Sequence, residues 1–329
     1  MISERVQTKL GDILTLKRGY DLPASDRREG EYPIVSSSGV SGSHNEAKAK
    51  APGVVTGRYG TIGELFYVER DYWPLNTALY VSDFKGNIPR YLYYFLHSMS
   101  FGQFSDKSSV PGVNRNHLHA IDVSFERNTD VQRAVVKILG DLDGKIDLLR
   151  EMNRTLEDIA RTLFKAWFVD FLPVRAKAAG ATSFRGMPQA LFDTLPDCFE
   201  TSEIGEIPKG WMPRGLGQVI ELAYGKSLPS TARSPGEVAV YGSGGLTGSH
   251  NETLVKGPAV VIGRKGTIGS IYWEDRDIFP IDTVFYLVPK QGPLIFHYHL
   301  LRSLSLSTMN TDAAVPGLNR NNVYRLQVA

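Results

Sequence analysis

The sequence has one cysteine, no long hydrophobic run and almost no excess of charge. Cys198 alone forms no internal disulfide, and one cysteine cannot build a cysteine-based zinc site, so the composition is typical of a reducing cytoplasm. No apolar run approaches the roughly 18 residues that a membrane-spanning helix needs, and Met1–Leu10 is too polar for a signal peptide. We therefore expect a cytoplasmic protein with no membrane segment and no bound metal.

Motifs of common enzymes are also missing. The chain has no phosphate-binding loop ending in GKS or GKT, no GxGxxG after a strand, no HExxH and no CxxC. It also lacks the DPPY or NPPF motif that amino-methyltransferases use. Only His44 and His250 hold matching places in an internal repeat, and no matched carboxylate or nucleophile accompanies them. We expect no catalytic residue and no cofactor in this chain.

The charge balance gives only a weak indication of a partner. The formal net charge is +2 and the pI is about 8.5. Proteins dedicated to nucleic acid are usually more basic, with a pI above about 9 for the binding domain. Any basic surface of this chain must therefore be local.

What the chain does contain is a long internal repeat. GSHNE occurs at Gly42–Glu46 and again at Gly248–Glu252, and from Leu10 to Val81 an offset of 206 aligns 72 positions, of which 31 are identical. After one deleted residue, PGVNRN aligns with PGLNRN. A period this long is too great for a solenoid, whose units have about 20–50 residues. It indicates a duplicated domain of ordinary size.

Each copy has the pattern of a mixed, β-rich domain. Short runs rich in Val, Ile, Tyr and Phe lie between Gly, Pro, Ser and Asn clusters, which favours strands joined by turns. The segments Ile88–Met99 and Pro293–Leu304 have apolar residues at helical spacing instead. We predict an α+β fold with two duplicated, mixed β-rich domains, at 1–129 and 211–329, separated by a spacer helix at 130–174 and a connector at 175–210.

The spacer has the pattern of a long, coiled-coil-like helix. It contains no proline before residue 173 and is rich in Leu, Ile, Arg, Glu and Asp. Apolar residues recur every seven positions, which is typical of a helix that pairs with another helix. About 40 helical residues make a rod of roughly 60 Å. The simpler alternative is an ordinary buried helix. The predicted partner-binding seam consists of Val135, Leu142, Leu149, Leu156 and Leu163.

The shared loops carry the side chains that suit nucleic acid. Arginine, asparagine and hydroxyl groups bind phosphates and base edges. The competing interpretation is structural, because glycines such as Gly57 and Gly60 are equally needed by tight turns, and half or more of the shared residues serve the common fold. The predicted DNA-binding residues are Lys17, Arg18, Ser36, Ser38, His44, Arg58, Tyr59, Thr61, Asn76, Asn114, Arg115, Asn116, Lys226, His250, Arg264, Lys265, Thr267, Asp282, Asn319, Arg320 and Asn321.

Taken with Gln132–Val174, the paired GTIG and PGxNRN segments make the chain resemble the specificity subunit of a type I restriction–modification system. The resemblance implies that each repeat reads one half of a split site in double-stranded DNA. It also implies that the helix sets the spacing and docks two methyltransferase subunits, which bind S-adenosylmethionine. Motor-nuclease restriction subunits would complete the complex. This chain would then be a non-catalytic recognition subunit.

The sequence departs from that family pattern in one respect. Members normally have a second long helix after the second recognition domain, packed against the first. Here Leu326 aligns with Ile121, and the residues that would align with the first helix are not in the sequence. We expect the seam at Val135–Leu163 to be covered by another helix, since apolar stripes of that size mark interfaces.

Two other functions compete with DNA recognition. Weak overall charge allows a duplicated scaffold whose repeats bind protein. A duplicated hydrolase would need two polar pockets with perturbed acid–base groups, and no motif indicates them. The salt dependence of DNA binding distinguishes DNA recognition from the scaffold, because phosphate contacts make affinity fall steeply with salt.

Positions that differ between the repeats are the better candidates for base reading, because the two halves of a split site generally differ. The differing pairs are Arg18 and Tyr224, Tyr59 and Lys265, Asn76 and Asp282, Ser36 and Gly242, and Ser38 and Gly244. The identical arginines, Arg58 with Arg264 and Arg115 with Arg320, are expected to hold phosphate or the fold instead.

Overall fold

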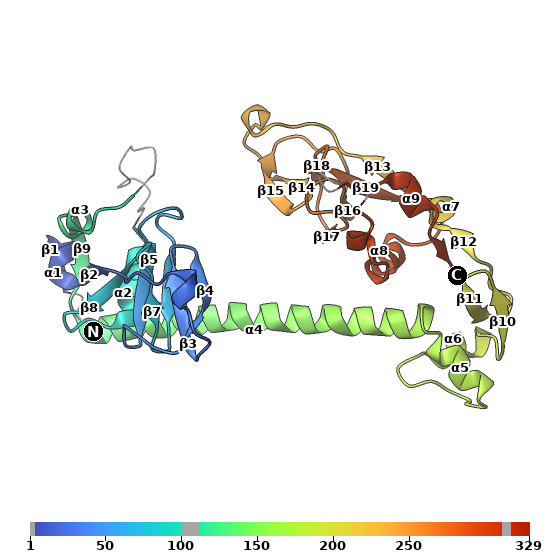
Figure 1. Ribbon diagram of the computed structural model, residues 1–329, viewed down its shortest axis with the longest axis horizontal. Coiled ribbons are helices and arrows are strands. Elements are labelled where there is room, and N and C mark those ends of the chain that lie inside the picture. Colours follow the sequence, from blue (N-terminus) through green and yellow to red (C-terminus); the bar gives the residue numbers. More distant parts are fainter. Residues whose placement is uncertain (1–3, 100–111, 311–316) are drawn as a thin grey trace. The chain divides into compact units, whose positions relative to one another are not determined.

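The computed structural model describes residues 4–99, 112–310 and 317–329. The chain divides into two units, Met1–Arg150 and Glu151–Ala329, and each contains one copy of the repeat (Figure 1). The parts of the shared loop segment at 109–111 and 314–316 lie outside the described residues. The units are described one at a time below.

The first repeat consists of short strands and short helices. In chain order its elements are β1 (Arg5–Lys9), α1 (Leu10–Ile13), β2 (Thr15–Arg18), the 3-10 turn η1 (Ala24–Asp26), β3 (Tyr32–Ser36), β4 (Gly39–His44), β5 (Gly53–Gly57), β6 (Leu65–Val68), β7 (Trp73–Pro74), β8 (Ala78–Asp83), α2 (Pro89–His97), α3 (Arg115–His119) and β9 (Asp122–Glu126).

The strands form three sheets, which are mostly antiparallel. One has the order β2-β8-β5-β6, another has the order β4-β3-β7, and β1 pairs with β9. The pairing of β3 with β7 is parallel, while the others are antiparallel. The two apolar runs around the GRYGTIG turn are β5 and β6, paired antiparallel as the sequence predicts.

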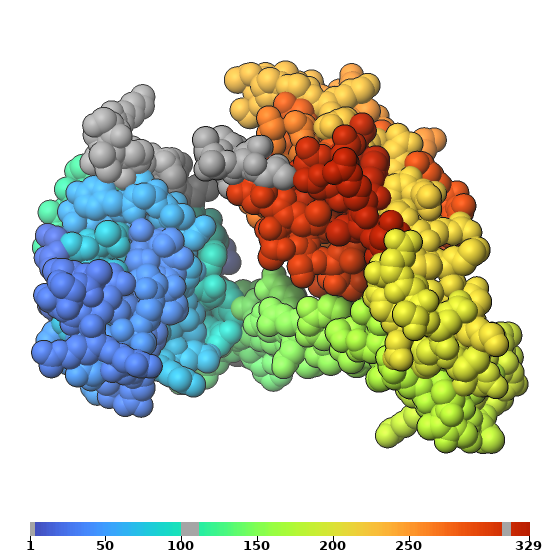
Figure 2. All heavy atoms as spheres, turned by 45° about the vertical axis from the view of Figure 1, so that its right-hand side comes forward, coloured from blue at the N-terminus to red at the C-terminus, as the bar shows by residue number. Residues whose placement is uncertain are grey.

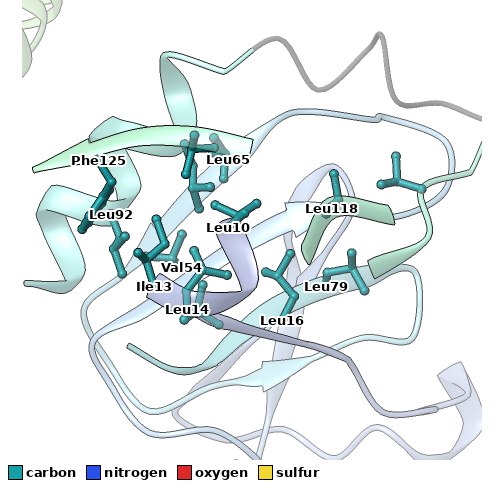
Figure 3. Packing of buried hydrophobic residues seen from close by; sticks show 14 residues of the cluster. Leu10, Ile13, Leu14, Leu16, Val54, Leu65, Leu79, Leu92, Leu118 and Phe125 are labelled. Atoms are coloured by element: carbon teal, nitrogen blue, oxygen red, sulfur yellow. The ribbon is translucent and has the colours of Figure 1, made fainter. Parts of the chain in front are cut away.

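The core of the unit forms where α1, α2 and α3 pack on the β2-β8-β5-β6 sheet. Leu92 and Leu96 of α2, four residues apart and so on one face of the helix, are both fully buried. Figure 3 shows Leu10, Val54 and Phe125 pointing into the same cluster. Elements far apart in sequence are thus joined by burial of aliphatic side chains, each of which contributes roughly 1.5–3 kcal/mol.

The second repeat has the same plan. Its elements are β12 (Arg214–Gly215), α7 (Leu216–Val219), β13 (Ile220–Tyr224), η3 (Ser230–Ala232), β14 (Val238–Gly242), β15 (Gly245–His250), β16 (Ala259–Gly263), β17 (Ile271–Glu274), β18 (Ile278–Pro280), β19 (Val284–Pro289), α8 (Leu294–Ser303), η4 (Leu306–Thr308), α9 (Arg320–Tyr324) and β20 (Gln327–Val328). The sheets are β13-β19-β16-β17, β15-β14-β18 and β12-β20, the same orders as in the first repeat. The predicted duplication and α+β fold class are confirmed.

One hydrogen bond is kept between the repeats although the side chain has changed. In the first repeat, Nε2 of His119 accepts a hydrogen bond from the backbone N–H of Leu16 at 2.9 Å. In the second, the hydroxyl of Tyr324 accepts from the backbone N–H of Leu222 at 2.8 Å. Leu16 and Leu222 are matching positions, so a histidine and a tyrosine perform the same task.

Between the repeats lies α4 (Thr129–Phe168), a continuous helix of 40 residues. Near its start, the buried side chain of Gln132 accepts a hydrogen bond from the backbone N–H of Ile88 and donates to the carbonyl of Glu126. Near its end, Phe164 lies in the core of unit 2, with its ring centroid 5.1 Å from that of Phe296. Exposed ion pairs one turn apart, such as Lys137 with Asp141, add a few tenths of a kcal/mol each.

The middle of α4 is exposed in the described chain. Leu142, Leu149, Leu156 and Leu163 are 53%, 46%, 54% and 41% exposed, while Val135 is half-buried. The atoms of this stretch, green in Figure 2, lie at the surface. An ordinary buried helix is therefore the wrong interpretation, and the apolar seam is available for another helix. Among the described residues, no helix is both long enough and apolar enough to cross a membrane.

The predicted end of the spacer helix is wrong by several residues. The helix ends at Phe168 instead of continuing to Val174, and Phe171 has a left-handed backbone with a φ of 52°. Pro173 explains the break, because in a continuous helix it has no N–H to donate to the carbonyl of Val169, four residues earlier, and its ring clashes with that carbonyl. A short helix, α5 (Leu172–Ala178), follows with Pro173 in its first turn, where proline is tolerated.

The connector is ordered where the sequence shows no periodicity. It contains α6 (Gln189–Thr194) and an antiparallel hairpin of β10 (Phe199–Ser202) and β11 (Gly205–Pro208). Phe171, Val174 and Ile207 form a small apolar cluster of their own. Its members are too far apart in sequence to give a period, so only the tertiary structure reveals them.

The exchange of His119 for tyrosine between the repeats predicts a pH effect on unit 1. Burial, with the nearby charges of Arg115 and Lys85, lowers the pKa of His119. At pH values between the folded and the unfolded pKa, the folded state therefore keeps this histidine neutral while the unfolded chain protonates it. The contribution of neutral His119 to the free energy of unfolding is complete above the unfolded pKa of about 6.5. It is lost as pH falls through the lowered folded pKa. His119→Tyr should remove that loss.

Urea unfolding of the parent chain and of His119→Tyr at about pH 7.5 and about pH 5 measures this effect. We expect the free energy of unfolding to fall further on acidification in the parent than in the variant. The same fall in both chains would contradict a neutral, buried role for His119.

Candidate nucleic-acid interface

In each unit the candidate site is built around a short arginine loop that follows a central strand. After β5, the backbone N–H groups of Arg58 and Tyr59 both donate to the carbonyl of Thr77, at 2.9 and 3.2 Å. Glycine is required at Gly57, because a Cβ there would lie 1.8 Å from the carbonyl oxygen of Thr61. After β16, Arg264 and Lys265 donate to the carbonyl of Thr283 in the same way.

The PGxNRN segment then docks on the arginine loop. In unit 1 the backbone N–H of Val113 donates to the carbonyl of Arg58 at 3.0 Å, and in unit 2 Leu318 donates to Arg264 at 2.8 Å. The residue after each arginine forms a further bridge, Tyr59 with Gly112 and Lys265 with Gly317. These backbone hydrogen bonds join segments that lie more than 50 residues apart in sequence.

The first asparagine of this segment has a structural role. The side chain of Asn114 accepts a hydrogen bond from the backbone N–H of Asn116 and caps α3. Asn319 accepts from Asn321 and Asn322 and caps α9. Asparagine is a preferred helix cap because its oxygen satisfies N–H groups at the start of the helix. The amide oxygens predicted to bind DNA are thus already engaged.

In unit 2 these segments enclose a polar cavity of about 300 Å³. It is lined by Tyr224 at the end of β13, by the arginine loop, and by the start of α9. The guanidinium groups of Arg264 and Arg320 lie 5.0 and 4.9 Å from the centroid of the Tyr224 ring. The predicted residues brought together here are Arg264, Lys265, Asn319, Arg320 and Asn321.

In unit 1 the same frame carries a different arrangement of side chains. The guanidinium of Arg58 stacks on the neighbouring ring of Tyr59, 4.5 Å from its centroid, and donates to its hydroxyl at 3.2 Å. Arg18, at the position of Tyr224, donates to the carboxylate of Asp21 at 3.5 Å. Arg115, which aligns with Arg320, is exposed.

The two units have therefore exchanged an aromatic residue and a cation. The ring at the exchanged position that lies against the shared arginine comes from the loop in unit 1 and from β13 in unit 2, where Arg264 also lies 5.8 Å from the centroid of Phe285. The cation occupies the other position, as Arg18 and Lys265 respectively. Sequence reasoning noted this mismatch but left Tyr224 out of the site. The signal that identifies it is the double exchange at two aligned positions.

A tyrosine pair flanks the site of unit 1. Lys17 donates to the hydroxyl of Tyr20 at 3.2 Å, and the hydroxyls of Tyr20 and Tyr80 are 3.2 Å apart. The hydrogen bond from Tyr80, helped by that from Lys17, lowers the pKa of Tyr20. Burial raises the pKa of Tyr80, so that Tyr80 remains a donor. Nearby, Asn76 donates to the same Asp21 carboxylate that holds Arg18.

The duplicated histidines belong to the fold, which corrects their prediction as DNA contacts. His44 and His250 are each only 5% exposed. Their Nδ1 atoms accept hydrogen bonds from the backbone N–H groups of Arg28 and Ser234, both at 3.1 Å. Each ring also packs edge-on against an aromatic ring two strands away in the same sheet, Trp73 of β7 and Phe279 of β18. The sequence pattern GSHNE is thus repeated to hold a loop against β4 and β15.

The remaining predicted residues are scattered around the arginine loops. Ser36 is buried and donates to the carbonyl of Gly39, so it serves the turn between β3 and β4 and is a second correction. Ser38, Asn116, Lys226, Thr267 and Asp282 are exposed, while Thr61 and Asn76 are half-buried. No group of three or more potential metal ligands is found among the residues that the structure describes.

Similar proteins are known. The family model of the type I restriction modification DNA specificity domain matches residues 3–158 and 208–325. The specificity subunit of the Haemophilus influenzae type I restriction enzyme HindI is 26% identical over 212 residues, which cover 50% of this chain and 46% of that protein. The MjaIX specificity subunit of Methanocaldococcus jannaschii is 26% identical over 148 residues, 44% of this chain and 30% of that protein.

A solved structure has the same fold. The crystal structure of a type I restriction–modification S subunit from M. genitalium aligns with a TM-score of 0.54 and 18% sequence identity, over 99% of this chain and 84% of that chain. The chain spans less than half the length of the two curated relatives named above.

Each of the two α+β modules carries arginines and an aromatic ring on the same backbone frame. Together they define a tandem-repeat protein with one basic site per repeat. The chain belongs to the family of type I restriction modification DNA specificity domains, whose model matches both repeats. The resemblance inferred from the central helix and the paired loop segments is confirmed.

A structural role for the buried histidines predicts a loss of stability without a loss of DNA contacts. His250→Ala leaves the N–H of Ser234 without its acceptor and removes the ring packed on Phe279. We expect the free energy of unfolding to fall by about 1–3 kcal/mol, the usual cost of an unsatisfied buried donor. His44→Ala should behave alike, and Ser249→Ala, at an exposed position of the same strand as His250, serves as the control. Weaker DNA binding at unchanged stability would contradict this role.

Proposed function

We propose that this chain is the sequence-specific DNA recognition subunit of a type I restriction–modification complex, with each repeat reading one half of a bipartite site. The observation that carries the proposal is the pairing of an identical backbone frame with different side chains in the two units. A frame repeated by duplication suits two contacts of the same kind with one duplex. Different side chains on it suit two different half-sites.

The chemistry of each site supports contact with DNA. Arginine offers forked donors to phosphate oxygens and to guanine, and an exposed aromatic ring offers a flat apolar surface. Tyr59 and Tyr224 are 39% and 49% exposed, although both are large aromatic residues. A protein-binding scaffold has no comparable need for arginines such as Arg264 and Arg320, which have no carboxylate partner among the residues that the structure describes.

The helix α4 supports a second part of the proposal, which concerns partners. Its exposed seam is suited to a helical partner, since an apolar stripe of this kind is stabilised by knobs-into-holes packing. We propose that methyltransferase subunits, which bind S-adenosylmethionine, dock on this region, and that motor-nuclease subunits join the complex. Methylation and cleavage then belong to those partners, and this chain contributes recognition.

The direct test is to select and footprint random-sequence duplex DNA with the chain assembled with its methyltransferase subunits. We expect a split site with two short specified halves and an unspecified spacer. Binding should weaken steeply with salt, because phosphate contacts release counterions. Binding with no sequence preference and no salt dependence would favour the protein scaffold.

The differing residues predict separate control of the two half-sites. Tyr59→Ala should relax the base preference at one half only, and Lys265→Ala at the other half only. Each lost base contact is worth about 1–3 kcal/mol of discrimination. Selection with each variant measures the effect, and equal weakening on every DNA sequence would contradict base reading by that residue.

The exposed seam predicts a partner defect without a folding defect. Leu149→Asp should leave the stability of both units unchanged, because Leu149 lies outside their cores. It should abolish co-purification with the methyltransferase subunit, since it introduces an unpaired charge into the apolar contact. Phe164→Asp is the contrasting variant and should unfold unit 2, whose core contains that ring. A Leu149→Asp complex as stable as the parent complex would contradict the docking assignment.

A further inference from the structure

The cavity in unit 2 has an arrangement of cations that unit 1 lacks. Tyr224 holds two guanidinium groups against one ring, those of Arg264 and Arg320. Cation–π contacts of this kind contribute about 0.5–1 kcal/mol at exposed sites and more where water is excluded. Two like charges are thus kept close together by an aromatic ring, without a carboxylate between them.

Each guanidinium is also anchored by a backbone oxygen. Nη1 of Arg264 donates to the carbonyl of Asp282 at 2.8 Å, and Nη1 of Arg320 donates to the carbonyl of Leu222 at 3.4 Å. The Nε atom of Arg320 is buried and has no hydrogen-bond partner in the described part of the chain. An arginine carries five N–H donors, so both groups retain donors that these bonds leave unused.

The charge in this cavity is not neutralised by any carboxylate among the described residues. In the part of the chain that the structure describes, no carboxylate oxygen lies within 4 Å of the cationic nitrogens of Arg264, Lys265 or Arg320; the ion pairs of unit 2 involve other residues. Positive groups that converge without a counter-ion repel one another, and an anionic ligand removes that cost. The cavity of about 300 Å³ provides room for such a ligand.

The matching place in unit 1 differs in each of these respects. Arg18 is held by the carboxylate of Asp21, and a donor of Arg58 is used by the hydroxyl of Tyr59. Arg115 stacks on no aromatic ring among the described residues, whereas Arg320 stacks on two, those of Tyr224 and Tyr324. The convergence of two arginines is therefore a property of unit 2 within this duplicated frame.

We propose that the cavity at Tyr224, Arg264 and Arg320 binds one backbone phosphate of DNA, and that the two repeats contribute unequally to the electrostatic part of the affinity. Arg264 and Arg320 donate to the phosphate oxygens, and Tyr224 is the positioning residue that holds both guanidinium groups. Lys265 lies at the edge of the same cavity. The inference rests on the proposed DNA-binding function and specifies one contact within it.

The salt dependence of binding to a mixed-sequence duplex tests the proposal with the full chain. The plot of log K against log salt has a negative slope. If the two arginines bind one phosphate, the double variant Arg264→Gln with Arg320→Gln should make that slope shallower by about 0.9. A change near twice that value would indicate two separate phosphates and would overturn the shared site. As a control, Arg302→Gln removes one positive charge, from a residue paired with Glu157 on α4, and should leave the slope unchanged.

The role of Tyr224 is tested separately. Tyr224→Leu removes the ring that holds both arginines and should lower the slope in the same direction as the double variant. Tyr224→Phe keeps the ring and should restore the slope relative to Tyr224→Leu, which a role based on the hydroxyl does not explain. Thermal unfolding of every variant checks that unit 2 remains folded. Equal slopes for the Leu and Phe variants would contradict the positioning role.

Further outcomes separate this inference from the proposed function. If the parent chain does not bind DNA, the proposed function fails and the inference fails with it. If it binds DNA with a sequence preference but without salt dependence, only the phosphate contact is overturned. If the parent has a steep slope that the double variant shares, the inference alone is overturned. Phosphorus NMR with inorganic phosphate, at constant ionic strength, covers the other source of the ligand. Binding of free phosphate that is lost in the double variant, with an unchanged DNA slope, would overturn the DNA assignment.

Discussion

In both repeats, a backbone hydrogen bond to an arginine carbonyl joins two loops that lie far apart in sequence. Val113 donates to Arg58 in unit 1, and Leu318 donates to Arg264 in unit 2. Without this bond the PGxNRN segment has no fixed place beside the arginine loop, and the cations that follow it cannot converge. The bond uses only backbone atoms, so it tolerates any side chain at the residue after the arginine. The rest of each site depends on that tolerance.

The two repeats carry different side chains on the same backbone frame and so form two different sites. The shared arginine stacks on Tyr59 in unit 1 and on Tyr224 in unit 2. Moving the ring from the loop to the strand changes which charges meet, although the backbone hydrogen bonds from the arginine loop to Thr77 or Thr283, and from Val113 or Leu318 to the arginine, are kept. Similar freedom exists in the core, where His119 and Tyr324 satisfy the same backbone N–H. The sites thus diverge in chemistry while the fold and its hydrogen bonds are preserved.

The central helix contributes to the packing of each unit and also has an exposed apolar seam. Gln132 ties its beginning to unit 1, and Phe164 places its last turns in the core of unit 2. Between them, four leucines seven residues apart remain about half exposed. Burying such side chains stabilises a contact by roughly 1.5–3 kcal/mol each. A helix that were only a linker would gain nothing from keeping these leucines in register.

The sequence alone determined the duplication, the α+β class, the arginine loops and the long helix, because each depends on local patterns or on identity between copies. It did not determine the burial of His44, the engagement of Ser36 and Asn114 in turns and caps, or the clustering around Tyr224. These depend on which distant segments meet, and residue spacing carries no record of that. The helix end was also misplaced, since Pro173 cannot donate to the carbonyl of Val169 in a continuous helix and clashes with it, which outweighs the continuing apolar residues. Tertiary structure alone decided which shared polar residues line the arginine sites and which hold the fold.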